Sequence, residues 1–170
     1  ALFKTDLLRR KAKLDRWSAL RFDLEHPWEG DTRERLSREG LCASQFVESF
    51  GTLGGGNHFA ELQTVENVLD AGEFKKLTLG KQQLVVLVHS GSRGLGTAIF
   101  RTARQMDSHD GFDAESDDGR AYLHAHDHAV AWARASRALI AARFLNALRS
   151  DSALAVDLPH NFVERGADGT

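Results

Sequence analysis

A short apolar run, QLVVLV at residues 83–88, constrains the fold more than any other part of the sequence. Its continuous apolar character and its β-branched residues are typical of a strand buried on both faces. HSGSRGLG follows directly at residues 89–96, and a helical pattern then continues to Met106. A strand, a glycine-rich turn and a helix N-terminus bring unpaired N–H groups together, so this order predicts an anion-binding turn with Arg93 as a bidentate phosphate donor. The alternative interpretation is that the glycines only shape a tight turn.

The rest of the chain alternates between helical and extended patterns, with an acidic loop at residues 107–118. No internal repeat and no linker long enough to separate two domains interrupts it. The sequence therefore predicts one α+β domain over residues 1–170, with a mixed sheet and flanking helices. Helices are expected at residues 5–24, 31–50 (bent near Gly40) and 120–148, and extended segments at residues 58–65 and 154–158.

The composition excludes several classes of protein. Apolar residues make up 42% and charged residues 27% of the chain, and the formal net charge is −2. Uniform binding to polyanions is therefore not expected, and any contact with nucleic acid requires a local patch. Cys42 is the only cysteine, so no internal disulfide can form, and we interpret Cys42 as a small core residue. No apolar run reaches the roughly 20 residues that span a bilayer and no signal-peptide pattern opens the chain, which predicts a cytoplasmic location.

A run of three glycines at residues 54–56 precedes NHFAE at residues 57–61. Each ordered glycine loses about 0.5–1 kcal/mol of backbone entropy, so the run indicates either a loose linker or a backbone that another group approaches closely. If the segment that follows is a strand, its two-residue period sends Asn57, Phe59 and Glu61 to one face and His58 to the other. One face would then suit a base and a phosphate, and the opposite face would suit a metal ion.

Two further groups of histidines need to be weighed. The sequence HAHDH at residues 124–128 contains spacings that can bind a metal ion, and it leaves open a metal-dependent hydrolase built on His124, His126 and His128. It lies within a strongly helical segment, where His124 and His128 share a face and His126 points away, so a solvated helix face is the competing interpretation. His160, which follows Pro159, is weak evidence by itself because most loop histidines bind nothing.

GTLGGGNHFAE at residues 51–61, HSGSRGLG at 89–96 and HNF at 160–162, in this order, closely resemble three motifs of the RtcB family of RNA ligases. The order of the first two motifs is highly specific. The resemblance covers nearly the whole chain and is greatest to the branch that is linked to a peptide-release-factor homologue. The long helical segment before the third motif also looks like that of the family, at Tyr122, Leu123, Ala129, Trp132, Ala133 and Arg137.

The resemblance implies an enzyme that joins an RNA 3′-phosphate or 2′,3′-cyclic phosphate to a 5′-hydroxyl, in RNA repair or tRNA splicing, with GTP and two Mn²⁺ ions. It implies that His58 binds one metal ion and that His89 and His160 bind the other. It implies that Arg93 faces a phosphate. The residues that would line the guanylate site are Asn57, Phe59, Ala60, Glu61 and Asn161.

Two motifs of the family do not occur within these 170 residues. The resemblance places D-x-G-C-G-M, which supplies a carboxylate and a bridging thiolate, before Ala1. It places H-R-K-G-A, whose histidine becomes guanylylated, after Thr170. The surroundings of Cys42 do not match the first motif, so we expect this chain alone to hold an incomplete site and to be inactive. A module that binds RNA or a partner without catalysis stays open as a further alternative.

Overall fold

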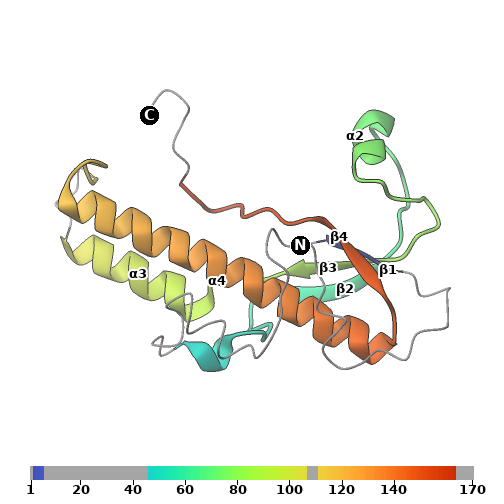
Figure 1. Cartoon of the computed structure of the whole chain (residues 1–170), viewed down its shortest axis with the longest axis horizontal. Helices are drawn as coiled ribbons and strands as arrows, with labels where there is room; N and C mark the ends of the chain where they lie inside the picture. The colour runs from blue at the N-terminus through green and yellow to red at the C-terminus, as the bar shows by residue number, and fades with distance from the viewer. Residues whose placement is uncertain (1, 6–45, 107–110, 164–170) are drawn as a thin grey trace.

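The computed structural model describes residues 2–5, 46–106 and 111–163 (Figure 1). The helix predicted at residues 5–24, most of the one predicted at 31–50, the bend near Gly40 and the core position of Cys42 lie outside these residues. At the end of the second predicted helix the structure has a short 3-10 helix, η2 (Val47–Ser49), within a turn. None of the helices in the part that is described is long and apolar enough to cross a membrane.

Four strands form one sheet in the order β2-β3-β1-β4: β2 (Phe59–Gln63), β3 (Val85–His89), β1 (Leu2–Thr5) and β4 (Ser152–Val156). Each of these neighbouring pairs is antiparallel. The α+β class is therefore confirmed, but the prediction of a mixed sheet is wrong for the described residues. β3 and β4, which α3 and α4 connect, are not neighbours because β1 lies between them, so this crossover produces no parallel pair.

The helices are α2 (Ala71–Lys76), α3 (Arg93–Met106) and α4 (Asp117–Leu148). The predictions of α3 and α4 are confirmed, whereas α2 was not expected. Figure 1 shows α3 beside one half of α4, while the other half of α4 lies against the sheet. The turn between β3 and α3 therefore lies where the sheet and both long helices meet.

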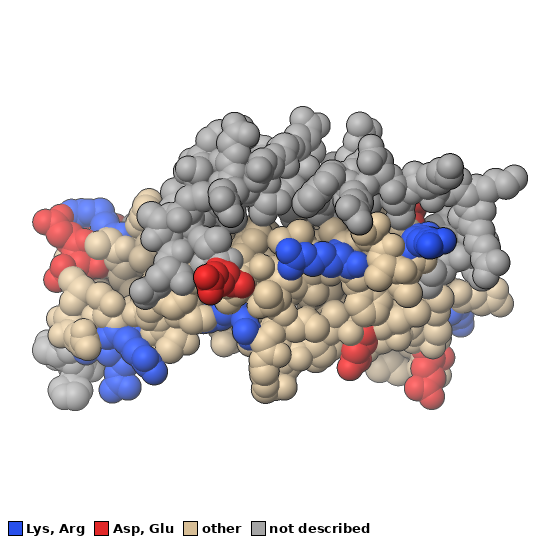
Figure 2. Space-filling model, turned by 90° about the horizontal axis from the view of Figure 1, so that it is seen from below, with Lys and Arg blue, Asp and Glu red and all other residues tan. Residues whose placement is uncertain are grey.

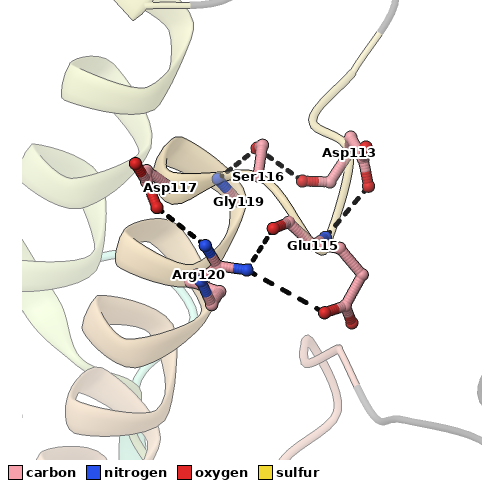
Figure 3. Close-up of polar contacts among 6 residues, drawn as sticks. All are labelled: Asp113, Glu115, Ser116, Asp117, Gly119 and Arg120. Atoms are coloured by element: carbon pink, nitrogen blue, oxygen red, sulfur yellow. Dashed lines mark hydrogen bonds and ion pairs between the residues drawn. The ribbon is translucent and has the colours of Figure 1, made fainter.

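The N-terminus of α4 is fixed by local hydrogen bonds (Figure 3). The hydroxyl of Ser116 accepts a hydrogen bond from the N–H of Gly119 at 3.0 Å and donates one to the carbonyl of Asp113 at 2.6 Å. This satisfies one of the amide groups that every helix leaves unpaired at its start. Arg120 forms an ion pair with Asp117 at 2.7 Å and also contacts Glu115. An added Cβ at Gly119 would lie 2.0 Å from the carbonyl oxygen of Asp113, so only glycine fits there.

The hydrophobic core lies between α4 and the sheet. Trp132 of α4 is fully buried, and its ring packs edge-on against Phe50 with a centroid distance of 5.2 Å. Val86 and Val88 of β3 belong to the same core cluster and are also buried. The core thus fixes β3 against α4 one residue before the strand ends at His89.

Candidate functional site

His89 and His160 approach each other at the carboxyl end of β3. His89 is the last residue of that strand, and His160 lies in the segment that follows β4. Their Nε2 atoms are 3.4 Å apart, and the ring centroids are separated by 5.2 Å. The two residues are 71 positions apart in the sequence, so only the tertiary fold brings them together.

His58 reaches the same place from β2. Phe59 is paired with His89 in the sheet, so His58 immediately precedes the residue opposite His89. The ring centroids of His58 and His89 are 6.3 Å apart, and those of Phe59 and His89 are 5.3 Å apart. The three histidines that the sequence singles out for metal binding are therefore brought together around His89, whose ring centroid lies 5.2 Å from that of His160 and 6.3 Å from that of His58.

The predicted division of residues 57–61 between two faces does not extend to His58, whose ring lies near His89 as the Phe59 ring does. The strand begins only at Phe59 and Asn57 lies in a turn, so the two-residue alternation does not extend back to His58. Residues paired across an antiparallel sheet project to the same side, which explains why the Phe59 ring lies next to His89 and not on an opposite face. Ala60 packs against the core, while Asn57 and Glu61 are exposed.

Arg93, the predicted phosphate donor, contacts the glycine-rich segment and His58. Its Nη1 donates a hydrogen bond to the carbonyl of Leu53 at 2.9 Å and another to Nδ1 of His58 at 3.0 Å. A Cβ on Gly54 would lie only 1.0 Å from that same Nη1, and the φ of Gly54 is +89°. The positive φ favours glycine at residue 54, and the group that approaches its backbone is the guanidinium of Arg93. Around Gly55 and Gly56, no described atom lies within 4 Å of an added Cβ.

The contact with Arg93 determines the tautomer of His58. A guanidinium has donors but no acceptor, so Nδ1 of His58 must provide the lone pair, and Nε2 carries the proton when the ring is neutral. Burial lowers the pKa of His58 below its usual value of 6.5, and the charge of Arg93 and the ring of His89 lower it further. Because the folded state holds this proton less tightly than the unfolded state, His58 contributes to stability above pH 6.5 and this contribution is lost as the pH falls.

Replacing Arg93 by glutamine should raise the pKa of His58, because one of the causes of its lowering is removed. The pKa should stay below 6.5, since burial is the larger cause. The ring protons of His58, followed by NMR over a pH titration, measure this directly. Arg134→Gln changes the same charge on an exposed part of α4 and should leave the titration of His58 unchanged. An identical pKa in Arg93→Gln would contradict the contact.

A cavity of about 570 Å³ opens beside His89 and His160, between β3, α3, α4 and residues 158–161. Ser90 and Asn161 line it, and the buried hydroxyl of Ser90 has no hydrogen-bond partner among the described residues. Asn161 also lies 3.0 Å from Nδ1 of His160 through its Oδ1. Of the five residues predicted to line a guanylate site, only Asn161 borders this cavity.

The histidine pair suits a shared metal ion only in part. Two nitrogen ligands of one ion, each at about 2.1 Å from it, lie roughly 3.0–3.4 Å apart, which matches the 3.4 Å between His89 and His160. Across residues 2–5, 46–106 and 111–163, however, no three His, Cys, Asp or Glu side chains are gathered closely enough to hold a metal ion. His58 would become a ligand through Nδ1 only if Arg93 moved away from that nitrogen.

Among the described residues, the HAHDH histidines form no metal site either. His124 is exposed, and Nε2 of His126 accepts a hydrogen bond from the backbone N–H of Val163 at 3.0 Å. The hydrolase alternative required three convergent imidazoles on α4, and this arrangement is not found.

The sequence analysis assigned no role to two side chains near the site. Arg137 of α4 is buried and forms an ion pair with Asp157, which is buried to a similar degree. Its Nη1 also donates a hydrogen bond to the carbonyl of Ser90 at 3.0 Å. The sequence contained one signal, because Arg137 lies among apolar residues of a predicted helix. A charge that is buried there requires a partner.

Comparison with known proteins agrees with the motifs. A family model described as tRNA-splicing ligase RtcB matches residues 23–168. The RNA-splicing ligase RtcB2 of Escherichia coli is 39% identical over 163 residues, which are 96% of this chain and 43% of that protein. The tRNA-splicing ligase RtcB of Aeropyrum pernix is 55% identical over 53 residues, which are 31% of this chain and 11% of that protein.

These matches define a member of a family named for RNA ligases: the chain belongs to the RtcB family. The RNA-splicing ligase RtcB of Mycobacterium tuberculosis is also similar, at 35% identity in an alignment of 132 positions that covers 67% of this chain and 31% of that protein. The chain thus spans less than half of the length of these relatives.

Proposed function

We propose that the protein containing this chain joins RNA 3′-phosphate or 2′,3′-cyclic phosphate ends to 5′-hydroxyl ends, using GTP and manganese. The observation that carries the proposal is the approach of His89 to His160, with His58 beside them. Three imidazoles from distant parts of the chain have no structural need to meet at one end of a sheet. Family membership and the nearby cavity support the same interpretation.

In this proposal His89 and His160 hold one metal ion through their Nε2 atoms. Manganese would act as a Lewis acid and as a template for phosphate oxygens. A carboxylate and a thiolate, which the resemblance assigns to a motif not found in these residues, would complete the coordination that two imidazoles leave open. The hydroxyl of Ser90 and the amide of Asn161 would contact the nucleotide or the RNA end from the cavity wall.

His58 and Arg93 have a coupled role in the proposal. While Arg93 donates to Nδ1 of His58, that nitrogen cannot bind a metal ion. If Arg93 turned toward a phosphate, it would release this nitrogen and place its own donors against the anion. Guanylylation of a histidine belongs to the proposal for the whole protein, since the resemblance assigns it to a motif not found in these 170 residues.

RNA ends are proposed to enter at the cavity and not along the surface in Figure 2. On that face, the Lys and Arg side chains of the described residues lie apart from one another, with Asp and Glu between them. Affinity for a nucleic-acid backbone depends on several cations that neutralise phosphates together. The described part of this face therefore offers no continuous basic track.

The proposal is tested by Mn²⁺ binding. His89→Ala is expected to weaken Mn²⁺ affinity at least tenfold, because it removes one of two imidazoles that share the ion. The loss of the free Mn²⁺ signal in electron paramagnetic resonance measures the affinity. His124→Ala, on the exposed face of α4, is the matched control and should leave it unchanged. Equal Mn²⁺ affinity in His89→Ala and the wild type would refute the metal site. GTP binding that needs no metal ion would favour a non-catalytic module.

A further inference from the structure

The segment that carries His160 is held against α4 at both of its ends. It runs from Asp157 to Val163, and Figure 1 shows it leaving β4 and running back along α4. Asp157 is bound by Arg137, and the N–H of Val163 is bound by His126. His160 and Asn161 lie between these two attachments.

Arg137 makes the first attachment. Its Nε donates a hydrogen bond to the carboxylate of Asp157 at 2.8 Å, and its Nη1 donates one to the carbonyl of Ser90 at 3.0 Å. Ser90 directly follows His89, and Asp157 precedes His160 by three residues. Because the guanidinium is a rigid planar fork, a single side chain fixes the strand that carries His89 relative to the segment that carries His160.

His126 makes the second attachment, and its hydrogen bonds determine which ring nitrogen carries the proton. The backbone N–H of Val163 can only donate, so Nε2 of His126 is the acceptor and the proton of the neutral ring is on Nδ1. Nδ1 then donates to the carboxylate of Asp127 at 3.0 Å. The His126 side chain is only 13% exposed, whereas Val163, which donates this hydrogen bond, is half exposed.

The helix sets the distance between the two attachments. Arg137 follows His126 by eleven positions, which is about three turns, so both side chains leave the same face of α4 about 16 Å apart along its axis. Six residues of extended chain reach roughly 20 Å. The segment between Asp157 and Val163, which bends at His160 and Asn161, is thus long enough to join the two attachments, and their separation restricts where His160 can lie.

We propose that His126 and Arg137 are positioning residues that form a clamp, defined as these two side chains of α4, which holds residues 157–163 so that His160 faces His89. This accounts for one histidine of the HAHDH sequence that the metal site does not use. The role of the clamp in metal binding rests on the proposed function, whereas its role in ordering the segment does not.

The test compares four variants of the full-length protein. His126→Leu removes the acceptor, His126→Gln keeps an oxygen acceptor near the place of Nε2, and His124→Leu makes the same substitution on the exposed face of α4. Val163→Pro removes the donor without touching the helix. Two quantities are measured in each variant that retains its fold by circular dichroism: deuterium exchange of the peptide spanning residues 157–163 and the affinity for Mn²⁺ alone.

In His126→Leu, exchange of the peptide should accelerate at least tenfold, and Mn²⁺ affinity should fall about tenfold, as is typical when a partner that orients a ligand is lost. Val163→Pro should weaken Mn²⁺ binding to a similar extent. His126→Gln should recover most of both properties, and His124→Leu should match the wild type. If His126→Leu does not fold, Val163→Pro alone decides the effect on metal affinity.

The clamp is overturned if His126→Leu exchanges as slowly as the wild type, or if exchange accelerates while Mn²⁺ affinity stays the same. It is also overturned if His124→Leu has the same effects as His126→Leu, since any change on α4 would then suffice. If the wild type fails to bind Mn²⁺, the proposed metal site is refuted, while the exchange rates still decide whether the clamp orders the segment.

Discussion

Replacing Arg137 by methionine is expected to lower the free energy of unfolding by about 3–5 kcal/mol, because it breaks a buried ion pair and leaves one charge behind. The side chains of Arg137 and Asp157 are only 6% and 7% exposed. Methionine would fill much of the volume but would leave the Asp157 carboxylate without its cation and the Ser90 carbonyl without its donor. Urea denaturation measures the loss, which is a large part of the stability of a typical domain.

The double variant Arg137→Met, Asp157→Leu separates the unpaired charge from the loss of packing. Replacing both members of a buried pair by apolar groups is often nearly neutral, so the double variant should recover most of the stability lost in the single one. The recovery should be incomplete, because the Ser90 carbonyl still lacks the donor seen at 3.0 Å. If the double variant were as unstable as the single one, an unpaired charge would not be the cause.

The elements with strong periodicity were predictable from the sequence. The apolar run at residues 83–88 became β3, shifted so that it includes His89, and the alanine-rich segment became α4. Both are long or uniform enough that burial decides their structure. The start of α4 could have been placed more closely, since Ser116 is a typical N-cap residue.

Other elements depend on tertiary contacts that no local pattern records. β1 has four residues and is fixed by pairing with β3 and β4, which lie about 80 and 150 residues later in the chain. A run this short carries too little periodicity to be recognised. The direction of strand pairing is likewise set by how the connections pack, which explains why the prediction of a mixed sheet was wrong.

The candidate site shows the same limit. The sequence singled out His58, His89 and His160, but mainly through their resemblance to family motifs. It could not show that Arg93 donates a hydrogen bond to His58, or that its guanidinium lies against the backbone of Gly54. It also did not predict the partners of Arg137, since Asp157 and Ser90 follow and precede it by 20 and 47 positions. Contacts over such separations are set by packing. The local sequence around each residue gives no sign of its partner.

One helix organises both the core and the site. Trp132 of α4 packs in the core cluster with Val86 and Val88 of β3, while Arg137 and His126 of the same helix hold the segment that carries His160. A helix is rigid over three turns. Helix α4 therefore fixes the position of the strand that carries His89 relative to the segment that carries His160. We therefore expect core variants of α4 to reduce stability by leaving a cavity, whereas Arg137 variants reduce it by leaving an unpaired charge.

Trp132→Ala tests this expectation and should lower the free energy of unfolding by about 3–5 kcal/mol, the range for truncating a buried tryptophan. Trp132 is fully buried and packs against Phe50 at 5.2 Å, so the cavity left behind cannot be filled from solvent without hydrating apolar walls. Trp132→Phe should lose much less, because it keeps an aromatic ring and removes an indole N–H that has no partner among the described residues. Arg134→Ala, on the exposed face of α4, should change stability by no more than about 0.5 kcal/mol. If Trp132→Ala and Arg134→Ala had equal stability in urea denaturation, the helix could not be the element that fixes β3 in place.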